Sequence, residues 1–170
     1  VKGQVMRAAG PMFNKMLEGA GASIASMASS EVYAGLQTGV LTGVNTSSGS
    51  FVSFKLYEQV KCATPPGKFG LWFMYEPILI SKKSFNALNA KQKSALLAAG
   101  KKAEAYMSGQ VAALDKKMED TYKAKKVKLA YMTEKDYNDW VAIAKKTSFK
   151  DFSAKVPAGA SLIEKALAVK

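Results

Sequence analysis

The stretch that decides the fold is SSEVYAGLQTGVLTGVNTSS, residues 29–48. A serine followed by Glu31 opens it as the capped first turn of an amphipathic helix, and Gly39 stands where such a helix ends. The apolar segment 40–46 then predicts a buried strand. Since ligands bind at the carboxyl ends of strands in open α/β sheets, the polar residues that close this strand predict a binding site.

Short strands and helices alternate around this stretch. We predict strands over residues 2–8 and 23–28, a helix from Gly10 and Pro11 to Leu17, and a further helix over 48–60. Repetition of strand, turn and helix favours parallel pairing. The sequence therefore predicts an α/β fold with a parallel or mixed sheet flanked by helices.

The second half of the chain contains one long helix. Residues 89–126 hold no proline and carry apolar side chains at three- and four-residue steps behind Asn89, a good N-cap. At 1.5 Å per residue such a helix is roughly 55 Å long, so it must run beyond one lobe. Around it we predict strand on one or both sides of Pro77, a helical turn over 82–88, a strand over 127–132, a helix that starts at Thr133 and Asp136, and a terminal helix over 160–169.

The composition excludes several kinds of chemistry. The 170 residues include no histidine and a single cysteine, Cys62. A Ser-His or Cys-His pair, a thiolate metal cage and an internal disulfide therefore cannot form within the chain. We predict no catalytic residue, no metal site and no cofactor, and we expect the chain not to be an enzyme.

The net charge of +12 does not indicate a nucleic-acid binder. Such proteins gather basic and aromatic residues on one element, whereas these lysines are spread over several amphipathic helices. A general positive charge would instead attract small anionic molecules. No apolar run is long enough to predict a membrane span, and no signal peptide is visible after Val1, so we expect a processed chain or an excised piece.

Three segments resemble the solute-binding proteins of tripartite ATP-independent periplasmic (TRAP) transporters. SSEVYAGLQTGVLTG is similar to the family's signature, although the signature's aspartate is Thr42 here. KGQVMRAAG resembles the family strand whose arginine forms a salt bridge with the ligand carboxylate, which places Arg7 at that position. EPILISKKSFNALNAKQKSALLAAGKKA resembles a later strand and the start of the long helix.

The resemblance implies a periplasmic-binding-protein-like lobe with one long lobe-spanning helix, from a two-lobed receptor that closes about a hinge. Such a receptor captures a small organic acid in the periplasm and delivers it to the subunits of a TRAP membrane permease. Family members are about twice this long, so the resemblance implies that the N-terminal lobe is absent. It divides the chain into residues 1–62 as the C-terminal lobe, 63–88 as the hinge crossing, 89–126 as the spanning helix and 127–170 as the return strand and last helices. We expect the isolated chain to self-associate through the surface that this lobe would cover. A sensing module that uses the same pocket remains the alternative.

The ligand-binding residues implied by the resemblance are Arg7, Asn45, Thr46, Ser29, Trp72 and Phe73. Arg7 would hold a carboxylate through two parallel hydrogen bonds, and its alternative is a surface arginine at a strand end. Asn45 and Thr46 would bond the rest of the ligand, whereas the other interpretation is helix capping by Thr46 and Ser47. Ser29 would present its side chain to the ligand, and its alternative is a plain N-cap. Trp72 and Phe73 would give an apolar wall, or pack in the core.

Overall fold

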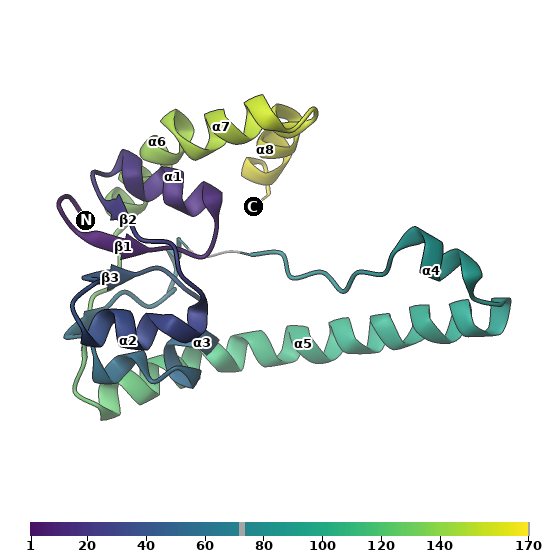
Figure 1. The fold of residues 1–170 in the computed structure, drawn as a ribbon, viewed down its shortest axis with the longest axis horizontal. Helices are drawn as coiled ribbons and strands as arrows, with labels where there is room; N and C mark the ends of the chain where they lie inside the picture. Colours follow the sequence, from purple (N-terminus) through teal and green to yellow (C-terminus); the bar gives the residue numbers. More distant parts are fainter. Residues whose placement is uncertain (72–73, 170) are drawn as a thin grey trace.

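The computed structural model describes residues 1–71 and 74–169. It contains a compact lobe from which one long helix projects far to one side (Figure 1). In chain order the elements are β1 (Val5–Arg7), α1 (Pro11–Gly19), β2 (Ser23–Ile24), a 3₁₀ turn (Ser29–Glu31), α2 (Val32–Gln37), β3 (Gly43–Val44), α3 (Ser48–Ser53), a second 3₁₀ turn (Leu56–Glu58), β4 (Cys62–Ala63), α4 (Lys82–Ala87), α5 (Ala90–Ala124), β5 (Lys128–Leu129), α6 (Glu134–Lys146), α7 (Ser148–Lys155) and α8 (Gly159–Leu167).

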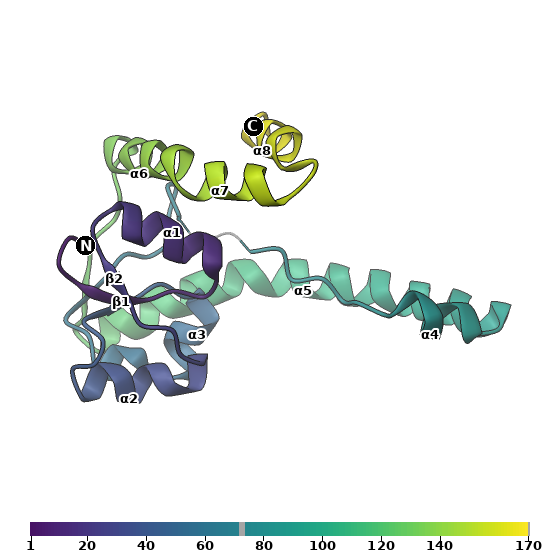
Figure 2. The same ribbon diagram turned by 45° about the horizontal axis from the view of Figure 1, so that its top comes forward.

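The central sheet is parallel, as predicted, with the strand order β2-β1-β3. Met6 pairs with Ile24 on one side and with Gly43 on the other. Helix α1 covers one face together with α6 and α7, and α2 lies on the opposite face (Figures 1 and 2). All three strands therefore end at one edge, which faces the side on which α5 projects (Figure 1).

The predicted strands are present but short. Strand β3 is short, and Thr42 helps to hold it against β1. The Thr42 hydroxyl accepts a hydrogen bond from the amide of Val5 at 2.8 Å. The Thr42 amide donates to the carbonyl of Val5 at 2.9 Å. At the position of the family's aspartate, this chain thus has a residue that joins the two central strands.

Two buried clusters stabilise the lobe. Val32, Leu41 and Leu56 pack beneath the sheet. Met118 and Tyr122, on the last turns of α5, pack with Val127. The second cluster attaches α5 to the lobe at its C-terminal end, so the rest of the helix extends free of the sheet.

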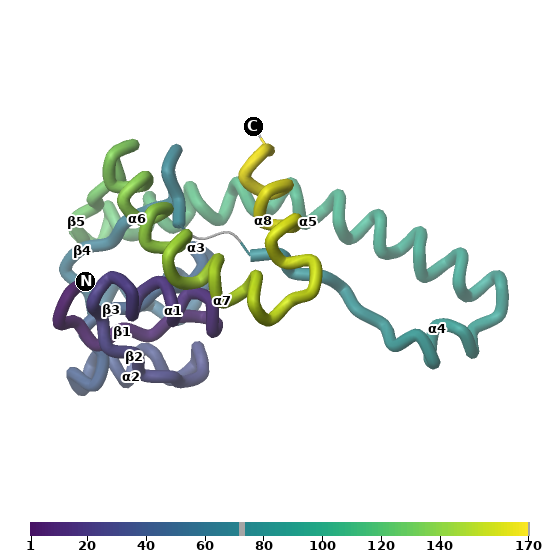
Figure 3. Tube along the Cα trace, turned by 90° about the horizontal axis from the view of Figure 1, so that it is seen from above, coloured from purple at the N-terminus to yellow at the C-terminus, as the bar shows by residue number. Residues whose placement is uncertain are grey.

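The prediction of one long helix is confirmed, since α5 runs unbroken through Gly100 and Gly109. Asn89 caps it: its Oδ1 accepts from the amide of Gln92 at 2.9 Å, and Gln92 Oε1 accepts from the amide of Asn89 at 3.0 Å. At the other end Lys126 takes the left-handed conformation, φ 60°, that ends a helix. Figure 3 shows α4 and the segment before it running beside α5 and joining it at the far tip.

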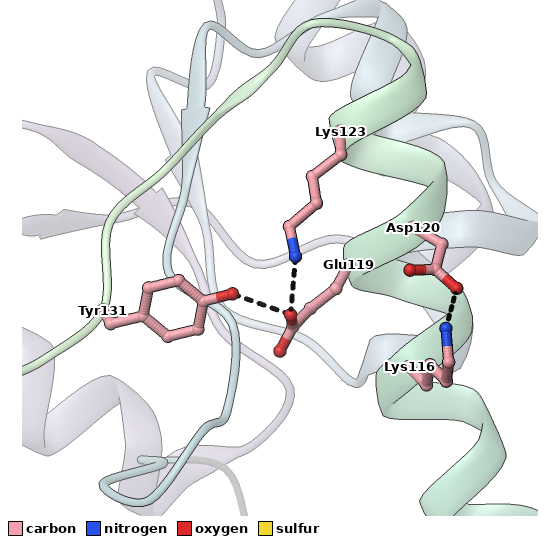
Figure 4. A network of polar contacts seen from close by, with 5 residues as sticks. All are labelled: Lys116, Glu119, Asp120, Lys123 and Tyr131. Carbon is pink, nitrogen blue, oxygen red and sulfur yellow. Dashed lines mark hydrogen bonds and ion pairs between the residues drawn. The ribbon is translucent and has the colours of Figure 1, made fainter.

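A polar network joins the end of α5 to the chain that follows β5 (Figure 4). Glu119 lies between two donors, accepting from the Tyr131 hydroxyl at 2.7 Å and from Lys123 Nζ at 3.3 Å. Lys116 and Asp120 form a separate ion pair on the exposed side of the helix. Tyr131 therefore reinforces the attachment that the buried cluster provides.

Two predictions of secondary structure were wrong, and one helix was missed. The helix expected over 48–60 ends at Ser53, because Lys55 takes a left-handed conformation with φ 52° before the second 3₁₀ turn. Residues 74–80 are extended but form no strand within the described part of the chain, so the strand expected beside Pro77 is not seen there. Helix α7 was not predicted. The capping box of Thr133 and Asp136 is confirmed at the start of α6.

Candidate functional site

The candidate site lies at the shared carboxyl edge of the central sheet. Arg7 is the last residue of β1, Asn45 directly follows β3, and Ser29 follows β2 after a short loop. The amide of Asn45 donates to the carbonyl of Arg7 at 2.8 Å, so the ends of β1 and β3 are held together. Parallel pairing therefore brings together residues that lie far apart in the sequence.

Arg7 is the only arginine among the 25 basic residues of the chain. It is buried, with 6% of its surface exposed, so the alternative of a surface arginine was wrong. Its Nε donates to the carbonyl of Met27 at 3.2 Å, and its Nη2 donates to Ser29 Oγ at 2.9 Å. Nη1 is buried without a hydrogen-bond partner among the described residues.

No carboxylate forms an ion pair with Arg7 in the part of the chain that the structure describes. Burial lowers the pKa of the Arg7 guanidinium, because removal of water disfavours the charged form. Buried charges in proteins are normally paired, and a buried donor without a partner is costly. The two bonds to Met27 and Ser29 fix the guanidinium plane, and its remaining nitrogen is left without a hydrogen-bond partner among the described residues.

Ser29 orients Arg7 and does not cap a helix, so the capping interpretation was wrong. Glu31 provides the cap instead, since its Oε2 accepts a hydrogen bond from the amide of Ala28 at 2.8 Å. This contact leaves Ser29 Oγ free to accept from Arg7. Ser29 thus positions the guanidinium of Arg7.

Asn45 and Thr46 both lie at the end of β3. Thr46 is buried and is not the cap of α3: Ser47 Oγ accepts from the amide of Ser50 at 3.2 Å instead. Of the two residues considered as alternative helix caps, Ser47 is therefore confirmed and Thr46 was wrong. Oδ1 of Asn45 is buried and has no hydrogen-bond partner within residues 1–71 and 74–169.

Sequence reasoning missed Asn14, in the first half of α1. Its Oδ1 is the third buried polar side-chain atom that lacks a partner among the described residues, beside those of Arg7 and Asn45. The available signal was a polar residue between the apolar Phe13 and Met16 of a helix that begins shortly after Arg7. The two remaining predicted site residues, Trp72 and Phe73, lie outside the described residues.

In the described ranges, no three His, Cys, Asp or Glu side chains are grouped so that they could hold a metal ion. No described helix combines the length and apolar character that crossing a membrane requires.

Comparison with known proteins identifies the family. The profile of bacterial extracellular solute-binding protein, family 7, matches residues 1–154. A solute-binding protein from Albidiferax ferrireducens is 33% identical over 162 residues, which cover 95% of this chain and 48% of that protein. The chain thus spans about half the length of this relative.

Solved structures agree with this assignment. A TRAP periplasmic solute-binding protein from Rhodoferax ferrireducens with bound malonate has a TM-score of 0.89 and 31% identity, and the match covers 99% of this chain and 56% of that one. One from Xanthobacter autotrophicus with bound β-D-galacturonate has a TM-score of 0.85 at 20% identity, covering 99% of this chain and 54% of its own, and supports the fold alone. Both family and fold class are as predicted from the sequence: the chain belongs to bacterial extracellular solute-binding protein family 7, the solute-binding proteins of TRAP transporters.

Proposed function

We propose that this chain is the carboxylate-holding lobe of a periplasmic receptor that captures a small organic acid and delivers it to a TRAP permease. The observation that carries the proposal is Arg7, a buried and oriented guanidinium with one unpaired nitrogen and no acidic partner among the described residues. The malonate and galacturonate bound by the two structural neighbours are carboxylates, which supports the same ligand class. Neither a nucleophile nor a metal ligand set enters this account, so the receptor is proposed to bind and not to catalyse.

The receptor is proposed to have a second lobe beyond this chain. Supporting this, Tyr75, Ile78 and Leu79 are each more than 80% exposed, and exposed apolar side chains continue along the projecting part of α5. Apolar patches of this kind mark interaction surfaces. The site edge and this surface lie on the same side of the lobe (Figure 1), so a second lobe seated here would close over Arg7.

On this proposal residues 1–62 form the C-terminal lobe, 63–88 cross the hinge, 89–126 span both lobes and 127–170 return to the first. Without its partner lobe, the chain is expected to self-associate through the exposed apolar surface. Analytical ultracentrifugation tests this expectation. Dimers or larger species of the isolated chain, beside a monomeric complete receptor, would support it, and a clean monomer of the isolated chain over a wide concentration range would contradict it.

The test of ligand capture uses the complete receptor, expressed from the reading frame that contains this chain. Isothermal titration against mono- and dicarboxylates should find a tight ligand, and Arg7→Lys should weaken it more than about a hundredfold. The reason is that a single ammonium cannot keep the bonds to Met27 and Ser29 and also bind the acid. Lys15→Gln, which removes a positive charge from the exposed face of α1, controls for the general positive field of the chain and should change affinity less than about threefold.

Two results would refute the proposed function. One is an Arg7→Lys receptor that binds its acid as tightly as the parent, since the carboxylate would then be held elsewhere. The other is a folded complete receptor that binds no carboxylate in the panel. Delivery to a permease is tested separately, by acid uptake into vesicles that contain the permease, with and without the receptor.

A further inference from the structure

We propose that the end of the lobe away from the projecting tip of α5 is an attachment surface for a membrane rich in anionic lipid headgroups. This basic end consists of five exposed lysines from two segments that are distant in sequence: Lys55, Lys61, Lys125, Lys126 and Lys128. Attachment there goes beyond carboxylate capture, because it involves neither Arg7 nor the carboxyl edge of the central sheet.

The fold brings these lysines together beside the last turn of α5. Nζ of Lys125 lies 5.6 Å from the ring centroid of Tyr57, in the 3₁₀ turn that directly follows Lys55. The amide of Lys128 donates to the carbonyl of Lys61 at 3.1 Å, where β5 pairs with β4. Figure 1 shows this end of α5 on the side of the lobe away from the projecting tip, whereas the site edge faces the tip. A membrane bound at the basic end therefore leaves the site edge open.

The chain itself does not compensate the positive charge of the basic end. None of the five lysines forms an ion pair among the described residues, and residues 121–133 contain no acidic side chain. Nearby carboxylates are already engaged. Glu58 and Glu119 accept hydrogen bonds from tyrosine hydroxyls at 2.8 and 2.7 Å, and Asp120 forms an ion pair with Lys116. An excess of positive charge is thus left for a partner outside the chain.

Two of these lysines have a backbone conformation that is unfavourable for a residue with a Cβ atom. Lys55 has φ 52° and Lys126 has φ 60°, and they are the residues other than glycine with positive φ in the described part of the chain. Glycine or asparagine is usual at such positions, and a strained residue of another type points to a function. Compensation of the α5 dipole does not explain Lys55, which lies outside that helix. A need for positive charge accounts for lysine at both positions.

The chemistry of the basic end fits lipid headgroups better than a protein partner. Protein interfaces are depleted in lysine and depend on buried aromatic, apolar or arginine side chains. Within residues 55–61 and 121–130 no large apolar side chain is exposed, and the basic residues there are all lysines. Ammonium groups on flexible stems match a fluid layer of anionic headgroups, where each lysine strengthens binding about fivefold.

Co-sedimentation of the complete receptor with lipid vesicles tests the proposal. The receptor should bind vesicles that contain about 30% phosphatidylglycerol at about 0.05 M salt, should be released at about 0.5 M salt, and should not bind pure phosphatidylcholine. A basic-end variant should weaken binding about a hundredfold, and it combines Lys61→Gln, Lys125→Gln and Lys128→Gln. The matched control removes three unpaired lysines from α6 and α7 and should change binding less than about threefold: Lys145→Gln, Lys146→Gln and Lys150→Gln.

Lys126→Gly separates binding from folding, because it removes the charge and the left-handed strain together. It should unfold at a higher Tm than the parent and still bind anionic vesicles about fivefold more weakly. Unchanged vesicle binding by a folded Lys126→Gly receptor would contradict the proposal.

Three further outcomes would overturn the proposal. Equal binding of the parent to neutral and anionic vesicles excludes headgroup charge as the cause. Equal losses in the basic-end variant and its control exclude a special role of the basic end. Recruitment only by neutral vesicles that contain the permease, lost in the basic-end variant, means that the partner is an acidic protein surface. In every case both triple variants should titrate the carboxylate ligand as the parent does, so these outcomes leave the proposed function to its own test.

Discussion

Tyr122 should be the residue that attaches the projecting helix to the lobe. It is fully buried, and its ring meets the edges or faces of Phe51 and Tyr57 at centroid distances of 5.8 Å each. Truncation of a buried aromatic side chain to alanine costs about 3–5 kcal/mol, so Tyr122→Ala should lower the free energy of unfolding by about 4 kcal/mol. For a chain of this length that is a fall in Tm of roughly 8–16 °C.

The hydroxyl of Tyr122 contributes little to this value. It donates to the carbonyl of Phe51 at 3.3 Å, which is long for an O–H donor. Tyr122→Phe should therefore cost about 1 kcal/mol or less. A large loss for Tyr122→Phe would mean that the hydrogen bond, and not ring packing, holds the helix.

Tyr106 supplies the matched control, because it is a tyrosine on the same helix with 69% of its surface exposed. In the isolated chain Tyr106→Ala should change the free energy of unfolding by no more than about 0.5 kcal/mol. In the complete receptor the same change should cost more, since the second lobe is proposed to cover this face. Urea unfolding followed by circular dichroism measures both. The packing argument is refuted if Tyr122→Ala costs no more than Tyr106→Ala in the isolated chain.

Three further predictions concern the same region. Burial raises the pKa of the Tyr122 hydroxyl, so the stability linked to its neutral form is complete below about pH 10 and is lost as pH rises towards the folded-state pKa. In that alkaline range the free energy of unfolding of Tyr122→Phe should depend less on pH than that of the parent, and an equal dependence would contradict this. Lys126 has a left-handed backbone conformation, so Lys126→Gly should stabilise the chain by about 1 kcal/mol, while Lys125→Gly, one residue earlier at φ −87°, should destabilise it. Thermal melts in which both variants shift the Tm in the same direction would refute the conformational argument. The hydrogen bond from Tyr131 lowers the pKa of Glu119, so the stability that the ionised carboxylate contributes is present above the unfolded pKa near 4.3 and is lost as pH falls through the folded pKa. The free energy of unfolding of Glu119→Gln should therefore fall less steeply with acidification than that of the parent, and an equally steep fall would contradict this.

Periodic and local signals in the sequence predicted most of the elements. The unbroken stripe behind Asn89 predicted α5, and the capping box of Thr133 and Asp136 predicted the start of α6. These features depend on neighbouring residues, so they can be read without tertiary structure. The break at Lys55 could not, because a lysine at positive φ has no local sequence signature.

The site was predicted in its position but not in its contacts. Alternating strands and helices placed Arg7 and Asn45 at one sheet edge, as the parallel register confirms. The role of Ser29 was missed, because a serine before a glutamate is usually a helix cap, and only the tertiary contact from Arg7 reveals its use. Asn14 was also missed, since the burial of a polar helix residue follows from the packing of α1 and not from its sequence.

The central claim is that Nη1 of Arg7 holds the ligand carboxylate, and a crystal structure of the complete receptor with its bound acid tests it most directly. A carboxylate oxygen is expected about 2.7–2.9 Å from Nη1, with the bonds from Nε to Met27 and from Nη2 to Ser29 unchanged. A bound acid whose carboxylate lies on other residues, with Nη1 still without an anionic partner, would contradict it.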